Sequence, residues 1–308
     1  MSRIHEALRR AEHEKGKGLP PAQPAPAEPA AAAPSPAAAA PAVPSPAPPA
    51  PAAPTPVASA LAAAAAFAVA PATDPLAPAP SLLESCRRVR WHEDPVRLLF
   101  LNSNAHPSAT EQLRTLRSRL YLMRESRALK TVLVTSAMPG EGKTFVCANL
   151  AYAFARQSDR RVLLLDADLR APAAHSLLGA PGEPGLASCL QGGAPLEKIV
   201  QRGPHENFYF IPAGKPPVNP AELVAGGKLK ALLAQLAPLF DWILLDSPAA
   251  GPVSDALRMA EWCDGVLLVV QGGKTPYDVA QSVTRELREK RLLGVVLNRT
   301  EGPGASAN

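Results

Sequence analysis

The apolar residues of the chain from about position 130 onward recur in short continuous runs that alternate with longer stretches of helical spacing. The runs are rich in Val, Ile and Leu and cover residues 131–135, 162–165, 208–211, 243–245, 266–270 and 295–297. The helical patterns between them fill residues 145–156, 221–236 and 277–290. Continuous apolar runs are typical of strands covered on both faces. Their alternation with helices predicts a doubly wound, mainly parallel sheet with helices on both faces.

A further helix is expected over residues 108–124, before the first of these strands. Apolar residues repeat on one of its faces at helical spacing, namely Leu113, Leu116, Leu120 and Met123. Ser108 and Glu111 have the S-x-x-E spacing of a capping box, which places the start of this helix at Ser108.

The N-terminal part of the chain has a different composition. More than half of the 36 prolines lie between Pro20 and Pro80, in a stretch of mostly alanine whose only charged residues are Glu28 and Asp74. Alanine and proline bury too little apolar surface to offset chain entropy, so we expect a disordered Ala/Pro-rich linker over residues 18–80. Residues 81–303 then form one domain, and residues 304–308 form a disordered tail.

Residues 1–17, ahead of the linker, have the pattern of a short amphipathic helix. Its apolar positions are Ile4, Ala7, Leu8 and Ala11, with basic residues around them. Such a helix suits docking on a partner or an acidic membrane surface, and it is equally compatible with a frayed terminal helix.

Charge and cysteine content narrow the classes of function. The net charge of +5 comes from basic residues scattered among acids, which gives no case for nucleic-acid binding. The four cysteines are far apart in the sequence, so neither a disulfide framework nor a zinc site is expected. The most apolar stretch of the linker is shorter than the ~20 residues of a spanning helix. We expect no signal peptide either, and a cytoplasmic location.

The strongest chemical signal directly follows the first predicted strand. Residues 137–144 read Ala-Met-Pro-Gly-Glu-Gly-Lys-Thr and lead into a helix, as in a phosphate-binding loop. The glycines let backbone N–H groups turn toward phosphate oxygens, Lys143 reaches the β and γ phosphates, and the Thr144 hydroxyl ligates Mg²⁺. Ala137 replaces the first Gly of the general pattern. A glycine turn that only connects strand to helix does not require Gly-Lys-Thr, so we expect a nucleotide site here.

Two other predicted strands end in carboxylates. Asp166 and Asp168 can both point into one crevice, where one lies near Mg²⁺ and orients or deprotonates an attacking hydroxyl. Asp168 is equally suited to capping the turn that follows, and Arg170 to pairing with a carboxylate or a phosphate. Asp246 ends another strand, where a P-loop fold holds Mg²⁺, usually through water.

These motifs, in this order, resemble the bacterial tyrosine kinases of polysaccharide biosynthesis, a branch of the MinD and ParA-like P-loop ATPases. The resemblance runs from about Thr110 to Arg299 and includes the D-x-D-x-R of residues 166–170. Further matching strings lie at residues 183–186, 212–214, 219–223, 264–266 and 296–299. Met138 stands where MinD and ParA-like ATPases carry a second lysine, and the Pro-Gly-Glu-Gly-Lys form is similar to the kinase branch.

The resemblance implies a P-loop NTPase fold and a site for ATP and Mg²⁺. It implies catalytic roles for Lys143, Asp166, Asp168 and Asp246, and metal ligands at Thr144, Asp166 and Asp246. It implies nucleotide contacts from Pro139, Gly140, Glu141, Gly142, Lys143, Thr144, Phe145 and Arg170, with Asn298 and Arg299 beside the adenine.

The resemblance also implies a ring of subunits that phosphorylate one another. Glu111, Arg114 and Arg117 match the E-x-x-R-x-x-R motif that contacts the next subunit in that family. The simpler interpretation of these residues is a capping box and a solvated helix face, and both can hold together.

The chain departs from the family pattern in its tyrosines. Many relatives end in a tyrosine cluster, but here the tyrosines are Tyr121, Tyr152, Tyr209 and Tyr277, so phosphorylation of a tail is not expected. Tyr152 and Tyr209 are expected to be core or half-buried residues. Ala249 replaces a proline of the family's D-x-P-P string, with a cost only in loop rigidity.

Two functions therefore stay open. The first is a MgATP-dependent protein-tyrosine kinase that regulates exopolysaccharide or capsule biosynthesis and export. Its implied partner is the cytoplasmic tail of a membrane polysaccharide co-polymerase, which recruits it to the inner membrane, with residues 1–17 as a candidate dock. The second is a MinD/ParA-like, ATP-driven assembly switch without phosphotransfer. The missing tyrosine tail favours the switch, whereas Met138 and the D-x-D-x-R motif favour the kinase.

Overall fold

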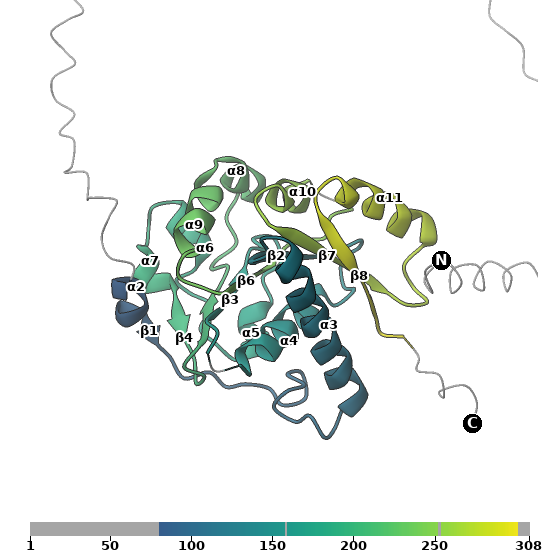
Figure 1. Ribbon diagram of the computed structural model, residues 1–308. Helices are drawn as coiled ribbons and strands as arrows, with labels where there is room; N and C mark the ends of the chain where they lie inside the picture. The colour runs from purple at the N-terminus through teal and green to yellow at the C-terminus, as the bar shows by residue number, and fades with distance from the viewer. Residues whose placement is uncertain (1–79, 158, 252–253, 301–308) are drawn as a thin grey trace, which may run out of the picture. The chain divides into compact units, whose positions relative to one another are not determined.

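The computed structural model describes residues 80–300, apart from residues 158 and 252–253 (Figure 1). The helix expected over residues 1–17, the linker up to residue 79 and the tail at 304–308 lie outside the described residues. The first described element is helix α2 (Pro80–Ser85), which begins at the expected end of the linker.

An eight-stranded sheet forms the centre of the described part of the chain, in the order β1-β4-β5-β3-β6-β2-β7-β8. Its strands are β1 (Arg87–Arg88), β2 (Thr131–Ser136), β3 (Val162–Asp166), β4 (Gln201–Arg202), β5 (Phe208–Ile211), β6 (Trp242–Asp246), β7 (Gly265–Gln271) and β8 (Leu292–Asn298). Every neighbouring pair is parallel except β4 with β5. The predicted doubly wound, mainly parallel sheet is confirmed.

Helices cover both faces of this sheet (Figure 1). One face packs against α3 (Pro107–Ser126), α4 (Lys143–Ala155) and α5 (Ala174–Leu178). The other packs against α2, α6 (Leu186–Leu190), α7 (Leu196–Ile199), α8 (Pro220–Ala225), α9 (Lys228–Leu236), α10 (Asp255–Ala260) and α11 (Tyr277–Arg288). Strand β3 shows why both faces must be covered, since Leu163 lies in one apolar core and Leu164 in the other.

The predicted helix over residues 221–236 is wrong in its continuity. Two helices, α8 and α9, are separated by Gly226 and Gly227, and Gly227 has a φ of 75°. This left-handed conformation is open to glycine at little cost, so the Gly-Gly pair ends one helix and begins the next.

The capping box predicted at Ser108 and Glu111 is also wrong. Helix α3 begins at Pro107, has His106 as its N-cap residue and has no side-chain cap hydrogen bond. Proline is well suited to the first helical position because its fixed φ matches the helix and its missing N–H has no partner there. Ser108 is therefore already inside the helix, and Glu111 pairs instead with Arg114 at 3.2 Å.

Two of the matching sequence strings meet in space beside the sheet. The N–H of Leu186 donates to the carbonyl oxygen of Pro212 at 2.7 Å, and that of Ala187 donates to Ala213 at 2.8 Å. A Cβ on Gly185 would overlap the backbone of Pro212 and Gly214. The glycines of the two strings therefore serve this close contact between backbone segments.

We predict that Gly185→Ala destabilises the domain, because the added methyl group forces the two segments apart. The expected cost is about 2 kcal/mol or more, which lowers Tm by roughly 4–8 °C. Gly193→Ala is the matched control, since Gly193 meets only one atom, at 3.4 Å, and has no positive φ. Equal melting temperatures for the two variants, measured by calorimetry, would contradict this account.

Candidate nucleotide-binding and catalytic site

Three functional segments meet at one edge of the sheet because they follow adjacent parallel strands. In the order β3-β6-β2, Asp166 and Asp246 are register partners, and Val134 of β2 pairs with Asp246. The carboxyl ends of parallel strands lie at the same edge, so the loop after β2 and the carboxylates after β3 and β6 converge. The structure thus brings together Lys143, Asp166, Asp168 and Asp246, as the sequence predicted.

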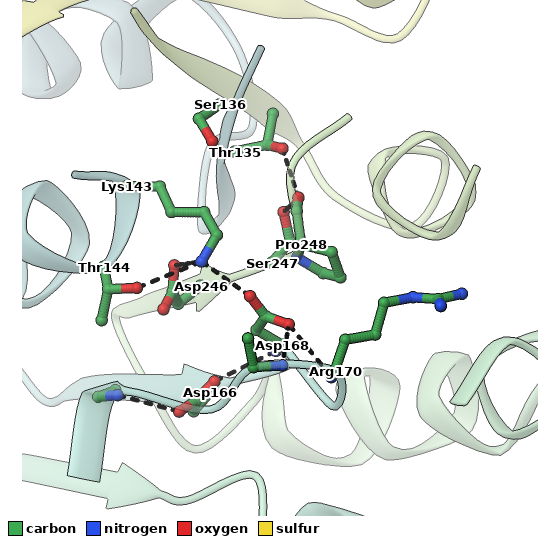
Figure 2. A network of polar contacts seen from close by, with 12 residues as sticks. Thr135, Ser136, Lys143, Thr144, Asp166, Asp168, Arg170, Asp246, Ser247 and Pro248 are labelled. Atoms are coloured by element: carbon green, nitrogen blue, oxygen red, sulfur yellow. Dashed lines mark hydrogen bonds and ion pairs between the residues drawn. The ribbon is translucent and has the colours of Figure 1, made fainter. Parts of the chain in front are cut away.

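Lys143 is the centre of this cluster (Figure 2). Its Nζ lies 2.8 Å from Asp168 Oδ2, 3.9 Å from Asp246 Oδ1 and 3.3 Å from Thr144 Oγ1. Burial lowers the pKa of Lys143, but the negative charges of Asp246 and Asp168 outweigh it and hold this pKa above its ordinary value. Lys143 is therefore a fixed positive charge at the start of α4.

The loop before α4 forms a cradle of backbone N–H groups. Gly140 and Gly142 have φ angles of 83° and 92°, which only glycine adopts readily. The N–H groups of Gly140, Glu141 and Gly142 donate to no acceptor within the described part of the chain, and the first N–H groups of α4 have no partner in the helix. A Cβ on Gly140 would meet nothing within 4 Å. The cradle fits phosphate oxygens.

Asp246 is a buried carboxylate that lacks a hydrogen-bond donor. It is fully buried, and neither of its oxygens has a hydrogen-bond partner among the residues described. Burial raises the pKa of Asp246 to about 6, an effect only partly offset by Lys143. A buried carboxylate that is only partly compensated fits a further cation.

The donor set around Asp246 suits Mg²⁺ better than a metal held by protein alone. The Thr144 hydroxyl and Asp246 Oδ1 both lie beside Lys143 Nζ, and no group of three or more His, Cys, Asp or Glu side chains forms a metal cage within the described residues. Mg²⁺ usually takes one or two protein ligands and completes its shell with phosphate oxygens and water. Asp246 and Thr144 fit that pattern.

Asp166 and Asp168 differ in what they contact. Asp166 accepts the N–H groups of Asp168 and Ala174 at 3.2 and 3.1 Å, and burial, then the charge of Asp246, raises its pKa well above the ordinary value. Asp168 accepts the N–H groups of Arg170 and Ala171 through Oδ1 while its Oδ2 pairs with Lys143. Both interpretations of Asp168, as a turn cap and as a site residue, therefore hold together.

Glu141 points into the protein. It is 3% exposed, and its carboxylate accepts the N–H of Met138 at 2.7 Å and the hydroxyl of Thr275 in the β7–α11 loop. Asn298, at the end of β8, donates to the carbonyl oxygen of Glu141 at 2.8 Å. Glu141 and Asn298 therefore fix the conformation of the loop through hydrogen bonds on the side that faces the protein interior. Only the proximity of two distant loops reveals this role, which no sequence spacing signals.

The other expected nucleotide contacts lie around the loop. Pro139 and Gly140 are exposed, and Phe145 is partly buried against the core. Arg299 has a φ of 53° and donates to Gln271 Oε1 at 3.4 Å. Arg170 pairs with Asp255 at 2.7 Å, so its partner here is a carboxylate (Figure 2 shows Arg170 extending away from Lys143). Asp255, 85 positions further along the chain, was missed because it belongs to no motif.

Comparison with known proteins identifies the family. Residues 132–308 match the CobQ/CobB/MinD/ParA nucleotide binding domain. The tyrosine-protein kinase YwqD of Bacillus subtilis is 36% identical over 191 residues, which is 61% of this chain and 80% of that protein. The chain therefore belongs to the bacterial tyrosine-protein kinases of this nucleotide-binding family. The tyrosine-protein kinase etk of Escherichia coli is 34% identical over 197 residues, 63% of this chain.

A solved structure agrees with this family. The kinase domain of the Escherichia coli tyrosine kinase ETK has a TM-score of 0.64 and 31% identity, covering 68% of this kinase chain and 83% of that domain. The match to full-length etk covers 27% of its length, so this kinase chain spans about a quarter of that longer relative.

The E-x-x-R-x-x-R motif of the kinase lies in α3, which packs beside α4. Arg114 is exposed, and within the described residues its one ion pair is with Glu111. Arg117 is partly buried and donates to the carbonyl oxygen of Ala153, near the end of α4, at 2.7 Å. Arg117 therefore supports the kinase domain internally, whereas Glu111 and Arg114 face outward.

We predict that Asp246→Asn stabilises the nucleotide-free kinase and abolishes its activity. The substitution removes a buried charge that accepts no hydrogen bond within the described residues and that Lys143, 3.9 Å away, offsets only in part, so Tm is expected to rise by roughly 2–6 °C at pH 7.5 in EDTA. Asp264→Asn is the matched control, since Asp264 Oδ2 accepts the N–H groups of Lys130 and Thr131 at 2.9 and 2.8 Å. Its Tm is expected to fall. A lower Tm for Asp246→Asn would refute the account of Asp246 as a strained carboxylate.

Proposed function

We propose that this protein is a MgATP-dependent protein-tyrosine kinase that transfers the γ-phosphoryl group of ATP to a tyrosine hydroxyl. The observation that carries the proposal is the position of Lys143. Its ammonium group lies between two carboxylates and beside loop N–H groups that have no acceptor within the described residues. This arrangement supplies a phosphate site and a proton acceptor next to each other. The family relatives are named as tyrosine-protein kinases.

The proposed roles follow from the contacts of each residue. The backbone N–H groups from Gly140 to Thr144 would hold the phosphates, and Lys143 would exchange Asp168 for phosphate oxygens. Asp168, released from Lys143, would accept the proton of the tyrosine hydroxyl, while its Oδ1 stays fixed by two backbone N–H groups. Asp246 and Thr144 would hold Mg²⁺, which neutralises charge that develops on the phosphates.

The assembly-switch alternative has less support. The curated relatives cited above are all named as kinases. Met138, which stands where the switch ATPases carry a second lysine, is 40% exposed and bears no charge. Its N–H is used to anchor Glu141, which is a structural role.

The cellular role that we propose is regulation of exopolysaccharide or capsule biosynthesis at the inner membrane. No helix within the described residues is long and apolar enough to cross a bilayer. We propose as its membrane partner a polysaccharide co-polymerase or chain-length regulator whose cytoplasmic tail activates the kinase. The proposed assembly is a homo-oligomer that uses the outward face of α3.

We predict that Lys143→Met weakens nucleotide binding by about 100-fold or more and abolishes phosphotransfer, because the loop loses its side-chain charge. The measurement is calorimetric titration with MgATP, followed by phosphotyrosine detection. Lys290→Met is the control, because Lys290 pairs with Glu261 at 2.6 Å at the end of α11, outside the site. Unchanged MgATP affinity in Lys143→Met would rule out the proposed phosphate site.

We predict that Arg114→Ala reduces the mass of the assembly formed with MgATP, measured by light scattering. Arg114 is preferred to Arg117 for this test because the Arg117 side chain also holds the end of α4. Arg119→Ala, another exposed arginine of α3, is the control. An unchanged mass for Arg114→Ala would remove α3 from the proposed interface.

A further inference from the structure

The tyrosines of residues 1–308 differ in how accessible their side chains are. The sequence contains four tyrosines, and all four lie in the described range. Among residues 1–308, the candidate phosphate acceptors are therefore Tyr121, Tyr152, Tyr209 and Tyr277.

Two of the four are core residues, as the sequence predicted. Tyr152 is 2% exposed, lies in α4 and donates its hydroxyl to Glu93. Tyr209 is 4% exposed, lies in β5 and packs edge-on against Phe240. Phosphorylation of either hydroxyl requires local unfolding of a central helix or strand, which is among the most stable parts of a domain.

Tyr121 is also held in place. Its ring packs edge-on against Phe154 and Trp242, with centroids 5.5 and 5.4 Å away, and its hydroxyl donates to Gln157. Burial raises the pKa of Tyr121, which makes its hydroxyl harder to deprotonate. A kinase would have to pull this ring out of an aromatic cluster.

Tyr277 alone among the four is exposed. Its side chain is one of the exposed large hydrophobic groups, at 46%, and it stands at the first position of α11 after the exposed residues Lys274 and Pro276. Its hydroxyl accepts only an exposed hydrogen bond, from Gln281 Nε2 at 3.2 Å. Breaking this exposed hydrogen bond, so that the hydroxyl can enter the active site of a kinase, costs little free energy.

Tyr277 lies close to the nucleotide-binding loop of its own chain, but its hydroxyl does not point toward that loop. Thr275, two residues earlier, donates to Glu141 of the loop, so α11 begins at the carboxyl edge of the sheet. Gln281 lies one turn further along α11, a helix that packs beside β7 and β8 (Figure 1). The hydrogen bond to Gln281 therefore draws the Tyr277 hydroxyl forward along α11, away from the helix start that contacts the loop.

We propose that Tyr277 is the acceptor tyrosine of this kinase and is phosphorylated by a second copy of the chain. The inference rests on the proposed kinase function and adds its substrate site. The Tyr277 oxygen forms a bond to the γ-phosphorus of ATP as the bond from that phosphorus to the bridging oxygen breaks, and ADP leaves. The hydroxyl proton passes to Asp168 of the second copy.

The test is phosphopeptide mapping of the purified full chain after incubation with MgATP. Trypsin places each tyrosine on a different peptide: cleavage after Lys and Arg, except at the Lys215-Pro216 bond, yields residues 120–124, 144–156, 203–228 and 275–285. A synthetic copolymer of Glu and Tyr, added in parallel, reports kinase activity independently of any tyrosine of the chain. Tyr277→Phe and Tyr121→Phe form the matched pair of variants.

We expect Lys143-dependent phosphate on peptide 275–285, at Tyr277, in the unmodified chain and in Tyr121→Phe. Tyr277→Phe should lose at least ten-fold of the phosphate on the chain while it phosphorylates the copolymer at an unchanged rate. Phosphate mainly on another tyrosine, or a phosphorylated copolymer with an unphosphorylated chain, overturns the proposal and leaves the kinase function intact. If neither the copolymer nor the chain is phosphorylated, the kinase function itself fails.

A mixing experiment tests the role of the second copy. Tyr277→Phe supplies an active kinase without the acceptor, and Lys143→Met supplies the acceptor without activity. Phosphorylated Tyr277 in peptide 275–285 of the mixture can come only from the Lys143→Met chains, so its appearance shows transfer between molecules. Phosphate on Tyr277 in the unmodified chain, but none in the mixture, would overturn transfer by a second copy.

Discussion

The ammonium group of Lys143 and the carboxylates around it are the interaction on which the site depends. Parallel strands that end at one edge of the sheet bring Asp168 and Asp246 within 2.8 and 3.9 Å of Lys143. Asp166, Asp168 and Asp246 are all buried, and three carboxylates this close to one another would repel without a cation. Lys143, the first residue of α4, therefore stabilises the convergence of these strand ends.

The same ion pairs let Lys143 exchange its carboxylate partners for phosphates when a nucleotide binds. Without nucleotide, Lys143 is neutralised by carboxylates; with phosphates in the cradle, it has other negative partners. Binding therefore trades one set of ion pairs for another and does not bury a free charge. Asp246, whose oxygens lack hydrogen bonds within the described residues, is the carboxylate that gains most from a cation.

The sequence predicted the elements whose signal is local and long. Each apolar run became a strand, and the helices at α3, α4 and α11 lie where helical spacing predicted them. Predictions failed where neighbouring residues favour different helix boundaries. Helix α3 begins at Pro107 and not at Ser108, and Gly227 divides one predicted helix into two. Pairing of Arg170 with a carboxylate was one of two predicted alternatives, but its identity as Asp255 and the role of Glu141 could not be predicted because they join segments far apart in the chain.

The brace between the loop and the last strand has a consequence for how the protein is made. Asn298 packs against Gly142 and holds the carbonyl oxygen of Glu141, although 157 positions separate the two hydrogen-bonded residues. A ribosome produces the loop long before it produces β8. The nascent chain therefore carries the glycines and the lysine without the support that shapes them, and its affinity for nucleotide arises late, when the final strand emerges and joins the sheet.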